Sequence, residues 1–149
     1  MALVVGMFSC SKTGYSNNSC TGPTAAQDSS LLLAFAQKYG ITPVRDTSYL
    51  YYQIINPGTG TAPTAHSKVY VRYAARLMDG TYFDSSAVSL RFALDSLIRG
   101  WQYGIPKIKP GGQIKLLVPS AQGYGCQGAG NVIPANAPLY FNIYLDSII

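Results

Sequence analysis

Six aromatic residues of this chain are spaced so that they could line one apolar pocket. If the segments around them are strands, in which side chains alternate between two faces, six residues would converge: Tyr73, Phe83, Phe92, Trp101, Tyr124 and Phe141. Such a pocket binds an apolar ring and uses a few polar groups, such as the carboxylate of the adjacent Asp84, to orient the ligand. Composition alone favours a simpler interpretation, in which the aromatic residues are ordinary hydrophobic core.

Nucleophilic and metal-dependent chemistry are not indicated by the remaining residues. The three cysteines (Cys10, Cys20 and Cys126) include no CxxC pair, and the single histidine, His66, lies in a stretch rich in Pro, Thr and Ala. We expect His66 to be a solvated loop residue rather than a ligand or a general base. Neither a zinc site nor a Cys–His nucleophilic pair is therefore predicted.

The composition is typical of one folded domain with an appendage. Of the 149 residues, 48% are apolar and 11% are charged. The net charge is +5, but the eleven Lys and Arg residues are scattered, which predicts a mildly basic solvated surface and no nucleic-acid interface. No stretch approaches the roughly 18 apolar residues of a membrane-spanning helix.

Hydrophobic periodicity predicts a short helix followed by several strands. An apolar face at positions i, i+3, i+4 and i+7 predicts a helix over 31–39, with an N-cap at Asp28-Ser29-Ser30 and a stop at Gly40. A second short helix is expected over 97–104, halted by Pro106, and 119–138 is a long loop of a length that is usually functional. Strands are expected over 49–55, 68–77, 90–94, 113–118 and 138–148. The sum is an α+β fold, an antiparallel half-barrel with one buried face wrapped on a short helix.

The first 23 residues differ in composition from the rest of the chain. Residues 1–9 form a short apolar block that ends in a small residue before Cys10, and a Ser/Thr/Asn/Gly-rich stretch follows. This order resembles the end of a bacterial lipoprotein signal, in which the Cys carries lipid, although a positively charged start is missing. The alternative is that the apolar block is accidental. In that oxidising setting Cys20 and Cys126 would either pair or remain two free thiols, and the sequence leaves both open.

Local motifs from residue 69 to residue 145 resemble the FKBP family. They are, in order, Val69-x-Val71-x-Tyr73, Asp79-Gly80, Phe83-Asp84-Ser85-Ser86, Phe92-x-Leu94, Leu97-Ile98-x-Gly100-Trp101-x-x-Gly104, Gly112, Val118-Pro119, Gly123-Tyr124-Gly125, Val132-Ile133-Pro134 and Leu139-x-Phe141-x-Ile143-x-Leu145. Each motif alone is weak, but their joint order and spacing are specific. The resemblance overrides the interpretation of the aromatic residues as core alone.

The resemblance implies a proline pocket and assigns its parts. Trp101 would be the floor, and the walls would be Tyr73, Phe83, Phe92 and Phe141. Leu97, Ile98 and Ile133 would form the rim. The backbone N–H of Ile98 and the hydroxyl of Tyr124 would hold substrate carbonyls, and Asp84 would be the single buried carboxylate, with an orienting role rather than that of a base. No cofactor or metal would be needed.

Some positions depart from the family pattern. The stretch between Ser86 and Phe92 is short, so the basic residue that often pairs with the pocket carboxylate has only Arg72 and Arg91 as candidates. Leu90 stands where an aromatic residue is common, and Ala129 and Gly130 replace bulkier residues in the loop. These departures affect substrate preference and inhibitor affinity more than activity.

The resemblance implies a peptidyl-prolyl cis-trans isomerase that accelerates the folding of exported proteins. The alternative is a chaperone or binding module with weak or no isomerase activity. Expected partners are proline-containing polypeptides and macrolide inhibitors, with no nucleic acid, and with a membrane only through lipid at Cys10. The expected location is the periplasmic side of the bacterial envelope, with the cytoplasm as the alternative. Three parts are predicted: a signal-like segment and tether over 1–23, a helix and strand extension over 24–66, and the isomerase domain over 67–149.

Overall fold

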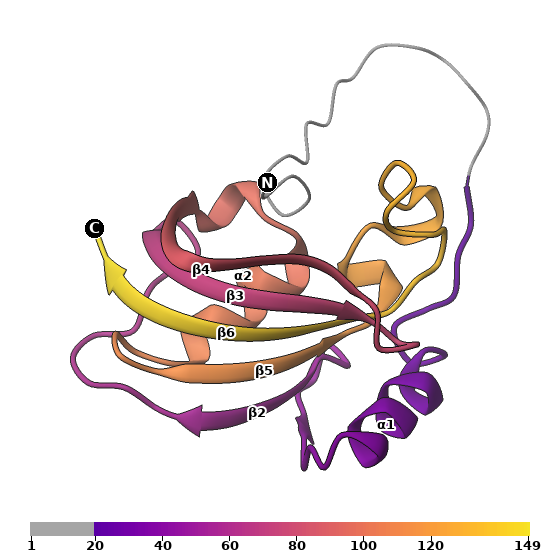
Figure 1. Ribbon diagram of the computed structural model, residues 1–149, viewed down its shortest axis with the longest axis horizontal. Helices are drawn as coiled ribbons and strands as arrows, with labels where there is room; N and C mark the ends of the chain where they lie inside the picture. Colours follow the sequence, from indigo (N-terminus) through magenta and orange to yellow (C-terminus); the bar gives the residue numbers. More distant parts are fainter. Residues whose placement is uncertain (1–19) are drawn as a thin grey trace.

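A six-stranded antiparallel sheet forms the centre of the molecule (Figure 1). The computed structural model describes residues 20–149. The strands are β1 (Val44–Arg45), β2 (Tyr51–Asn56), β3 (Lys68–Leu77), β4 (Tyr82–Ala93), β5 (Gln113–Val118) and β6 (Leu139–Ile148), and they lie in the order β1-β2-β5-β6-β3-β4. The predicted α+β class with an antiparallel sheet is confirmed. Strand β2 begins later than the sequence pattern indicates, because Tyr49 has a positive φ of 69°, a conformation that no strand residue adopts.

The inner face of the sheet carries the main hydrophobic core and is covered by helix α2 (Arg99–Gly104). The inward residues of β6 are fully buried, as their alternation predicts. Gly100 and Gly104 let α2 approach β5 closely, because a Cβ atom at either position would clash with the side chain of Val118 or Leu116. The short 3₁₀ segments Leu94–Ser96 and Ile105–Lys107 flank α2. The helix begins two residues later than expected, since Ile98 has an extended ψ of 150°.

Helix α1 (Ser29–Lys38) lies on the opposite, outer face of the sheet (Figure 1). Its buried residues are those of the predicted apolar face, and they pack on outward residues of three strands, namely Tyr51, Leu117 and Tyr140. Burial under this helix raises the pKa of Tyr140 to about 12. The expectation of one buried face was therefore incomplete, because α1 creates a second, smaller core.

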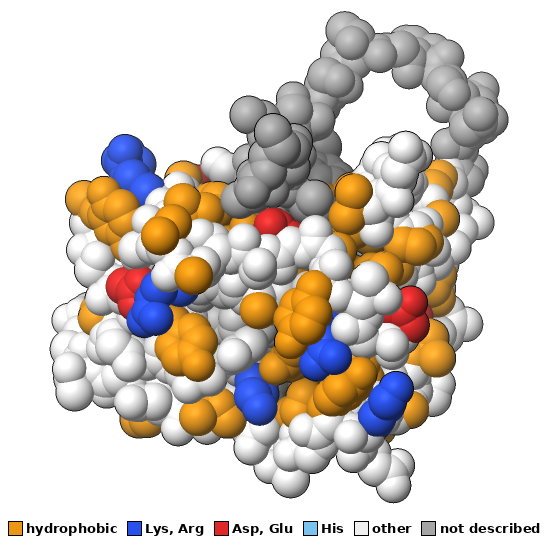
Figure 2. Space-filling model, in the orientation of Figure 1, with side chains coloured by type: hydrophobic (Ala, Val, Ile, Leu, Met, Phe, Trp, Pro, Cys, Tyr) orange, Lys and Arg blue, Asp and Glu red, His pale blue; other side chains and the backbone are white. Residues whose placement is uncertain are grey.

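Next to α1 the outer face combines aromatic rings with a cation. Arg76 of β3 places its guanidinium 4.3 Å from the ring centre of Tyr39 and 4.6 Å from that of Tyr82, so aromatic rings and cations cover one another here. In the view of Figure 2, Lys and Arg side chains are spread among apolar ones and do not gather in a single patch. None of the helices within residues 20–149 has the length and apolar character needed to cross a bilayer.

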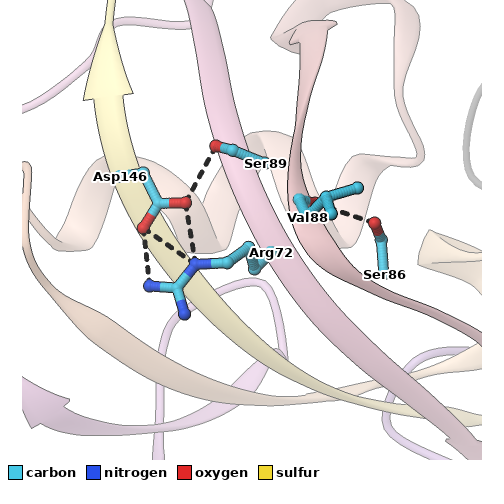
Figure 3. Close-up of polar contacts among 5 residues, drawn as sticks. All are labelled: Arg72, Ser86, Val88, Ser89 and Asp146. Atoms are coloured by element: carbon cyan, nitrogen blue, oxygen red, sulfur yellow. Dashed lines mark hydrogen bonds and ion pairs between the residues drawn. The ribbon is translucent and has the colours of Figure 1, made fainter.

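Strand β4 is much longer than the predicted 90–94 segment and contains a bulge. Its pairing with β3 shifts register between Val71 and Tyr73, so that residues 87–89 have no partner position on β3. Side chains hold the bulge: Ser86 donates to the Val88 carbonyl at 2.7 Å, and Ser89 donates to Asp146 of β6 at 2.8 Å (Figure 3). The small polar residues of this stretch carry no strand pattern, which explains why the sequence did not reveal it.

The ion pair between Arg72 and Asp146 crosses from β3 to β6 beside this bulge (Figure 3). Hydrogen bonds from Arg72 hold the pKa of the Asp146 carboxyl below its ordinary value, against a smaller opposing effect of burial. A depressed pKa in the folded state stabilises the fold above the unfolded value and loses that effect as pH falls through the folded one. We expect Asp146→Asn to cost about 1 kcal/mol in the free energy of unfolding at pH 7 and progressively less below about pH 4.

Urea unfolding of both proteins at pH 7 and near pH 3 measures this difference. The control is the same substitution in an Arg72→Gln background, where the pH-dependent difference in unfolding free energy should become much smaller, because only the hydrogen bond from Ser89 remains. If the difference in unfolding free energy between wild type and Asp146→Asn is the same at both pH values, the charge of Asp146 does not contribute to stability.

Candidate active site

Trp101 is the centre of an aromatic cluster on the inner face of the sheet. It is fully buried, and three rings meet it edge-on: Tyr73 at 5.2 Å, Phe141 at 5.4 Å and Phe92 at 6.0 Å between centroids. Phe83 continues the cluster, with its ring 6.0 Å from that of Phe141. Edge-to-face pairs of this kind add to burial and fix the relative orientation of the rings. The structure thus brings these five sequence-predicted residues together.

The cluster is assembled from segments that are distant in the sequence. Strands β3, β4 and β6 contribute one side, and helix α2 brings Trp101 against them. Trp101 and Phe141 are closed off by their neighbours, whereas Phe83, Phe92 and Tyr124 are only partly buried and pack around them. The cluster is thus fully buried at its centre and partly exposed at its edge, as expected for the lining of a pocket rather than for a closed core.

Asp84 lies at the side of this cluster and is 8% exposed. The hydroxyl of Tyr73 donates a hydrogen bond of 2.7 Å to its Oδ2 atom. Burial raises the pKa of Tyr73 above its usual range, and the hydrogen bond and the charge of Asp84 raise it further. The Tyr73 hydroxyl therefore remains a donor throughout the neutral range, and it holds the carboxylate in one orientation.

Neither basic candidate pairs with Asp84. Arg72 lies on the outer face in its ion pair with Asp146, and Arg91 is exposed and stands opposite Tyr70, another outward residue. The alternation of strand faces explains this result, because both arginines occupy outward positions whereas Tyr73 and Asp84 point inward. The carboxylate instead accepts the hydrogen bond from the hydroxyl of Tyr73.

Tyr124 sits in the loop between β5 and β6 and packs against the same core. Burial, and to a lesser extent the charge of Asp84, raises the pKa of its hydroxyl. The hydroxyl is therefore also protonated at neutral pH, as a hydrogen-bond donor to a ligand must be.

The predicted rim residues Leu97, Ile98 and Ile133 are buried at the edge of the cluster. Ile98 is the N-cap of α2, and its carbonyl accepts hydrogen bonds from the N–H groups of Trp101 and Gln102. The Ile98 N–H precedes the helix and is not part of its hydrogen-bond ladder. A cavity of about 550 Å³ adjoins the rim; its lining includes Leu97, Ile98, Arg99, Gln102, Ala121 and Gly123.

Sequence reasoning missed the residues that fasten the Tyr124 loop to the N-terminal segment. Asp28 was expected to cap α1, yet its side chain makes no capping hydrogen bond and instead contacts Ser120. Cys20 and Cys126, for which two alternatives were open, form a disulfide. The only signal for these contacts in the sequence was the presence of the two cysteines. Cys10 lies outside the described residues.

Comparison with known proteins identifies the family of the chain. Residues 59–146 match the family described as FKBP-type peptidyl-prolyl cis-trans isomerase. The chain is 44% identical over 88 residues to a probable FKBP-type 25 kDa peptidyl-prolyl cis-trans isomerase of Pseudomonas aeruginosa, covering 59% of this chain and 39% of that protein. It is 39% identical over 114 residues to the FKBP-type isomerase FkpA of Escherichia coli, covering 74% and 41%. The chain thus spans less than half of the length of these relatives.

Solved structures show the same fold. A peptidyl-prolyl cis-trans isomerase of Pseudomonas syringae superimposes with a TM-score of 0.71 at 32% identity, covering 86% of this chain and 98% of the other. The crystal structure of FkpA from Escherichia coli gives a TM-score of 0.73 at 34% identity, covering 83% and 60%. The matched segment contains every residue of the aromatic cluster, together with Asp84 and Tyr124. The chain therefore belongs to the family of FKBP-type peptidyl-prolyl cis-trans isomerases.

Proposed function

We propose that this domain catalyses cis–trans isomerisation of X–Pro bonds in polypeptides that it binds over Trp101. The observation that carries the proposal is the half-open aromatic cluster around Trp101 beside the hydrogen-bonded pair of Tyr73 and Asp84. Membership of the family supports the reaction. Proline-containing chains are accordingly the substrate class.

An apolar pocket can accelerate this reaction without a covalent step. The barrier of roughly 18–20 kcal/mol comes from the partial double bond of the peptide C–N bond. At the twisted transition state that resonance is lost and the carbonyl becomes less polar. An aromatic environment therefore favours the twisted state over the planar, more polar ground state, which is differential binding of the transition state.

The residues divide this work between gripping and orienting the substrate. In our proposal the proline ring enters between the partly exposed walls above Trp101, and the rim residues Leu97, Ile98 and Ile133 limit its exit. The Ile98 N–H and the Tyr124 hydroxyl hold carbonyl groups of the substrate. One carbonyl can then stay fixed while the other rotates. Asp84 acts as an orienting charge that Tyr73 keeps in place.

A prolyl-peptide exchange assay tests the activity. We expect the purified protein to accelerate exchange well beyond the uncatalysed time of tens to hundreds of seconds. Because Trp101 is the only tryptophan of the chain, its fluorescence reports ligand entry into the pocket directly. Failure to accelerate exchange, or full activity in a Phe83→Ala/Trp101→Ala double variant, would refute the proposal.

The pH dependence of catalysis is a further prediction. The raised pKa values of Tyr73 and Tyr124 keep both hydroxyls protonated beyond the ordinary tyrosine range, and no step uses a general base. We expect kcat/KM to stay constant between roughly pH 6 and pH 9, below the ordinary tyrosine pKa. The measurement is the exchange assay across this range, for the wild type and for Asp84→Asn. A bell-shaped profile that Asp84→Asn flattens would instead identify Asp84 as a proton-transfer group.

A chaperone or binding module is the second candidate. Two departures from the family pattern motivate it: the stretch between Ser86 and Phe92, which contains the β4 bulge, is short, and the loop 119–138 has few bulky side chains. A holding function would suppress aggregation of unfolded clients even in the Phe83→Ala/Trp101→Ala variant. If the Phe83→Ala/Trp101→Ala variant no longer suppresses aggregation, a chaperone surface independent of the pocket is excluded.

The proposal extends to an exported protein of the bacterial envelope that accelerates the folding of other exported chains. The disulfide between Cys20 and Cys126 supports this setting, since such bonds persist in oxidising compartments. Lipid at Cys10 would tether the domain to a membrane, and macrolide inhibitors would occupy the proline pocket. Mass spectrometry of the protein isolated from cells tests whether Cys10 carries lipid. Trp101 fluorescence during titration with a macrolide tests whether the inhibitor binds the pocket.

A further inference from the structure

The loop that carries Tyr124 is fastened on both sides of that residue by the N-terminal part of the chain. The attachment points in the loop are Ser120, Gln122 and Cys126, and their partners are Asp28, Ser48 and Cys20. Two attachments precede Tyr124 and one follows it. All three partners precede residue 59, where the segment that matches the family begins.

The first attachment is a buried carboxylate. Asp28 accepts two hydrogen bonds at its Oδ2 atom, one of 2.7 Å from the Ser120 N–H and one of 2.6 Å from the Ser120 hydroxyl. Asp28 is 3% exposed and Ser120 is 1% exposed. Hydrogen bonds to a charged acceptor are roughly twice as strong as neutral ones. Asp28 sits at the start of α1, and the core under Leu32 and Phe35 fixes that helix to the sheet.

The second attachment is the side chain of Gln122, which donates to the Ser48 carbonyl at 2.5 Å and is 6% exposed. Ser48 belongs to a turn that is itself held, because Asp46 accepts from the Ser48 N–H and lies 3.2 Å from Lys107. The third attachment is covalent. The disulfide joins Cys20 to Cys126, whose Cα atoms lie 5.8 Å apart.

These contacts address a physical problem of the site. A loop has many accessible conformations, and fixing each residue costs about 1–2 kcal/mol of conformational entropy. A hydrogen-bonding group on a loop is therefore held less accurately than one on a strand. We propose that residues 20–48 form a brace that positions the Tyr124 hydroxyl over the pocket, with Asp28 as its main positioning residue. The inference deepens the proposed function and, in its catalytic part, rests on it.

The test is a double-mutant cycle between Asp28 and Tyr124. We expect Asp28→Ala to lower kcat/KM about tenfold, since a small displacement of a positioning group costs that much or more. In a Tyr124→Phe background the same substitution should lower kcat/KM by less than about twofold, because the group that it positions is already absent. Asp28→Asn, which keeps the shape of the side chain, serves if the alanine variant does not fold.

A merely structural role for Asp28 would give equal losses in both backgrounds, and that result would overturn the inference. Asp79→Ala is the matched control, because Asp79 also accepts a backbone N–H, that of Thr81, but in the exposed β3–β4 turn. It should leave kcat/KM unchanged.

Hydrogen exchange of the amides of residues 120–136 is the second readout, and it does not depend on activity. Exchange should become faster in Asp28→Ala and in Cys20→Ser/Cys126→Ser than in Asp79→Ala. Unchanged exchange would overturn the brace. A wild type without isomerase activity but with this exchange pattern would refute the proposed function while supporting the brace.

Discussion

Replacing Trp101 with alanine is expected to lower the free energy of unfolding by about 3–5 kcal/mol. Trp101 is fully buried and meets the rings of Tyr73, Phe92 and Phe141 edge-on, so its removal abolishes three aromatic contacts and leaves a cavity. Domains of this size are stable by only about 5–15 kcal/mol. A large share of the total stability would therefore be lost, and with it the floor of the pocket.

Urea unfolding followed by circular dichroism measures this effect, since the variant lacks the only tryptophan. The matched control is Tyr103→Ala, which removes another large aromatic side chain from the same helix at a position that is 41% exposed. That substitution should cost far less, because exposed positions contribute little. Comparable losses at both positions would show that Trp101 does not support the core.

The regular strands could be predicted because their side chains alternate. Strands β3 and β5 have the bounds that the pattern gives, and alternate residues of β6 from Leu139 to Leu145 face the core. Strand β4 could not be predicted, since its middle consists of small polar residues around a bulge whose pairing depends on β3. Periodicity therefore did not reveal the strand segment that contains Phe83 and Asp84, and only the family motifs pointed to it.

The surface on which helix α1 packs could likewise not be predicted from a local sequence pattern. The helix itself follows from its apolar face, but the surface it covers consists of Tyr51, Leu117 and Tyr140 from three separate strands. Each of these points to the outer face, where alternation alone predicts solvent. A side chain that is buried by a distant element carries no periodic signal of its own.

Polar contacts over long sequence distances were the hardest to anticipate. Asp28 has the sequence context of an N-cap, and only the fold brings Ser120, 92 residues away, within hydrogen-bond reach. The carboxylate of Asp84 shows the same limitation, because its tyrosine partner became evident only once the registers of β3 and β4 were known. The clustering of the aromatic residues was predictable, whereas the hydrogen-bond partners of Asp28 and Asp84 were not.

Phe83→Ala is expected to lower kcat/KM for proline peptides by about 10- to 100-fold while the protein remains folded. Phe83 is only partly buried, yet its ring packs on Phe141 and forms one wall of the proposed pocket. Full burial of such a side chain stabilises by about 1.5–3 kcal/mol, and each 1.4 kcal/mol is a factor of ten in rate. Because the proline ring would shield this wall in the transition state, its loss should affect catalysis more than folding.

The adjacent Tyr82 supplies the control for this experiment. Tyr82→Ala removes a similar ring from the neighbouring position of β4, but Tyr82 is 62% exposed and lies beside Arg76 on the outer face. Its substitution should leave kcat/KM within about twofold of the wild type, as is usual for exposed residues away from a site. The exchange assay on both variants, with Trp101 fluorescence to measure binding, shows whether catalysis depends on the inner face of β4, the outer face, or both. If the two variants lose activity equally, the reaction does not take place in the pocket over Trp101, and another surface of the domain must be sought.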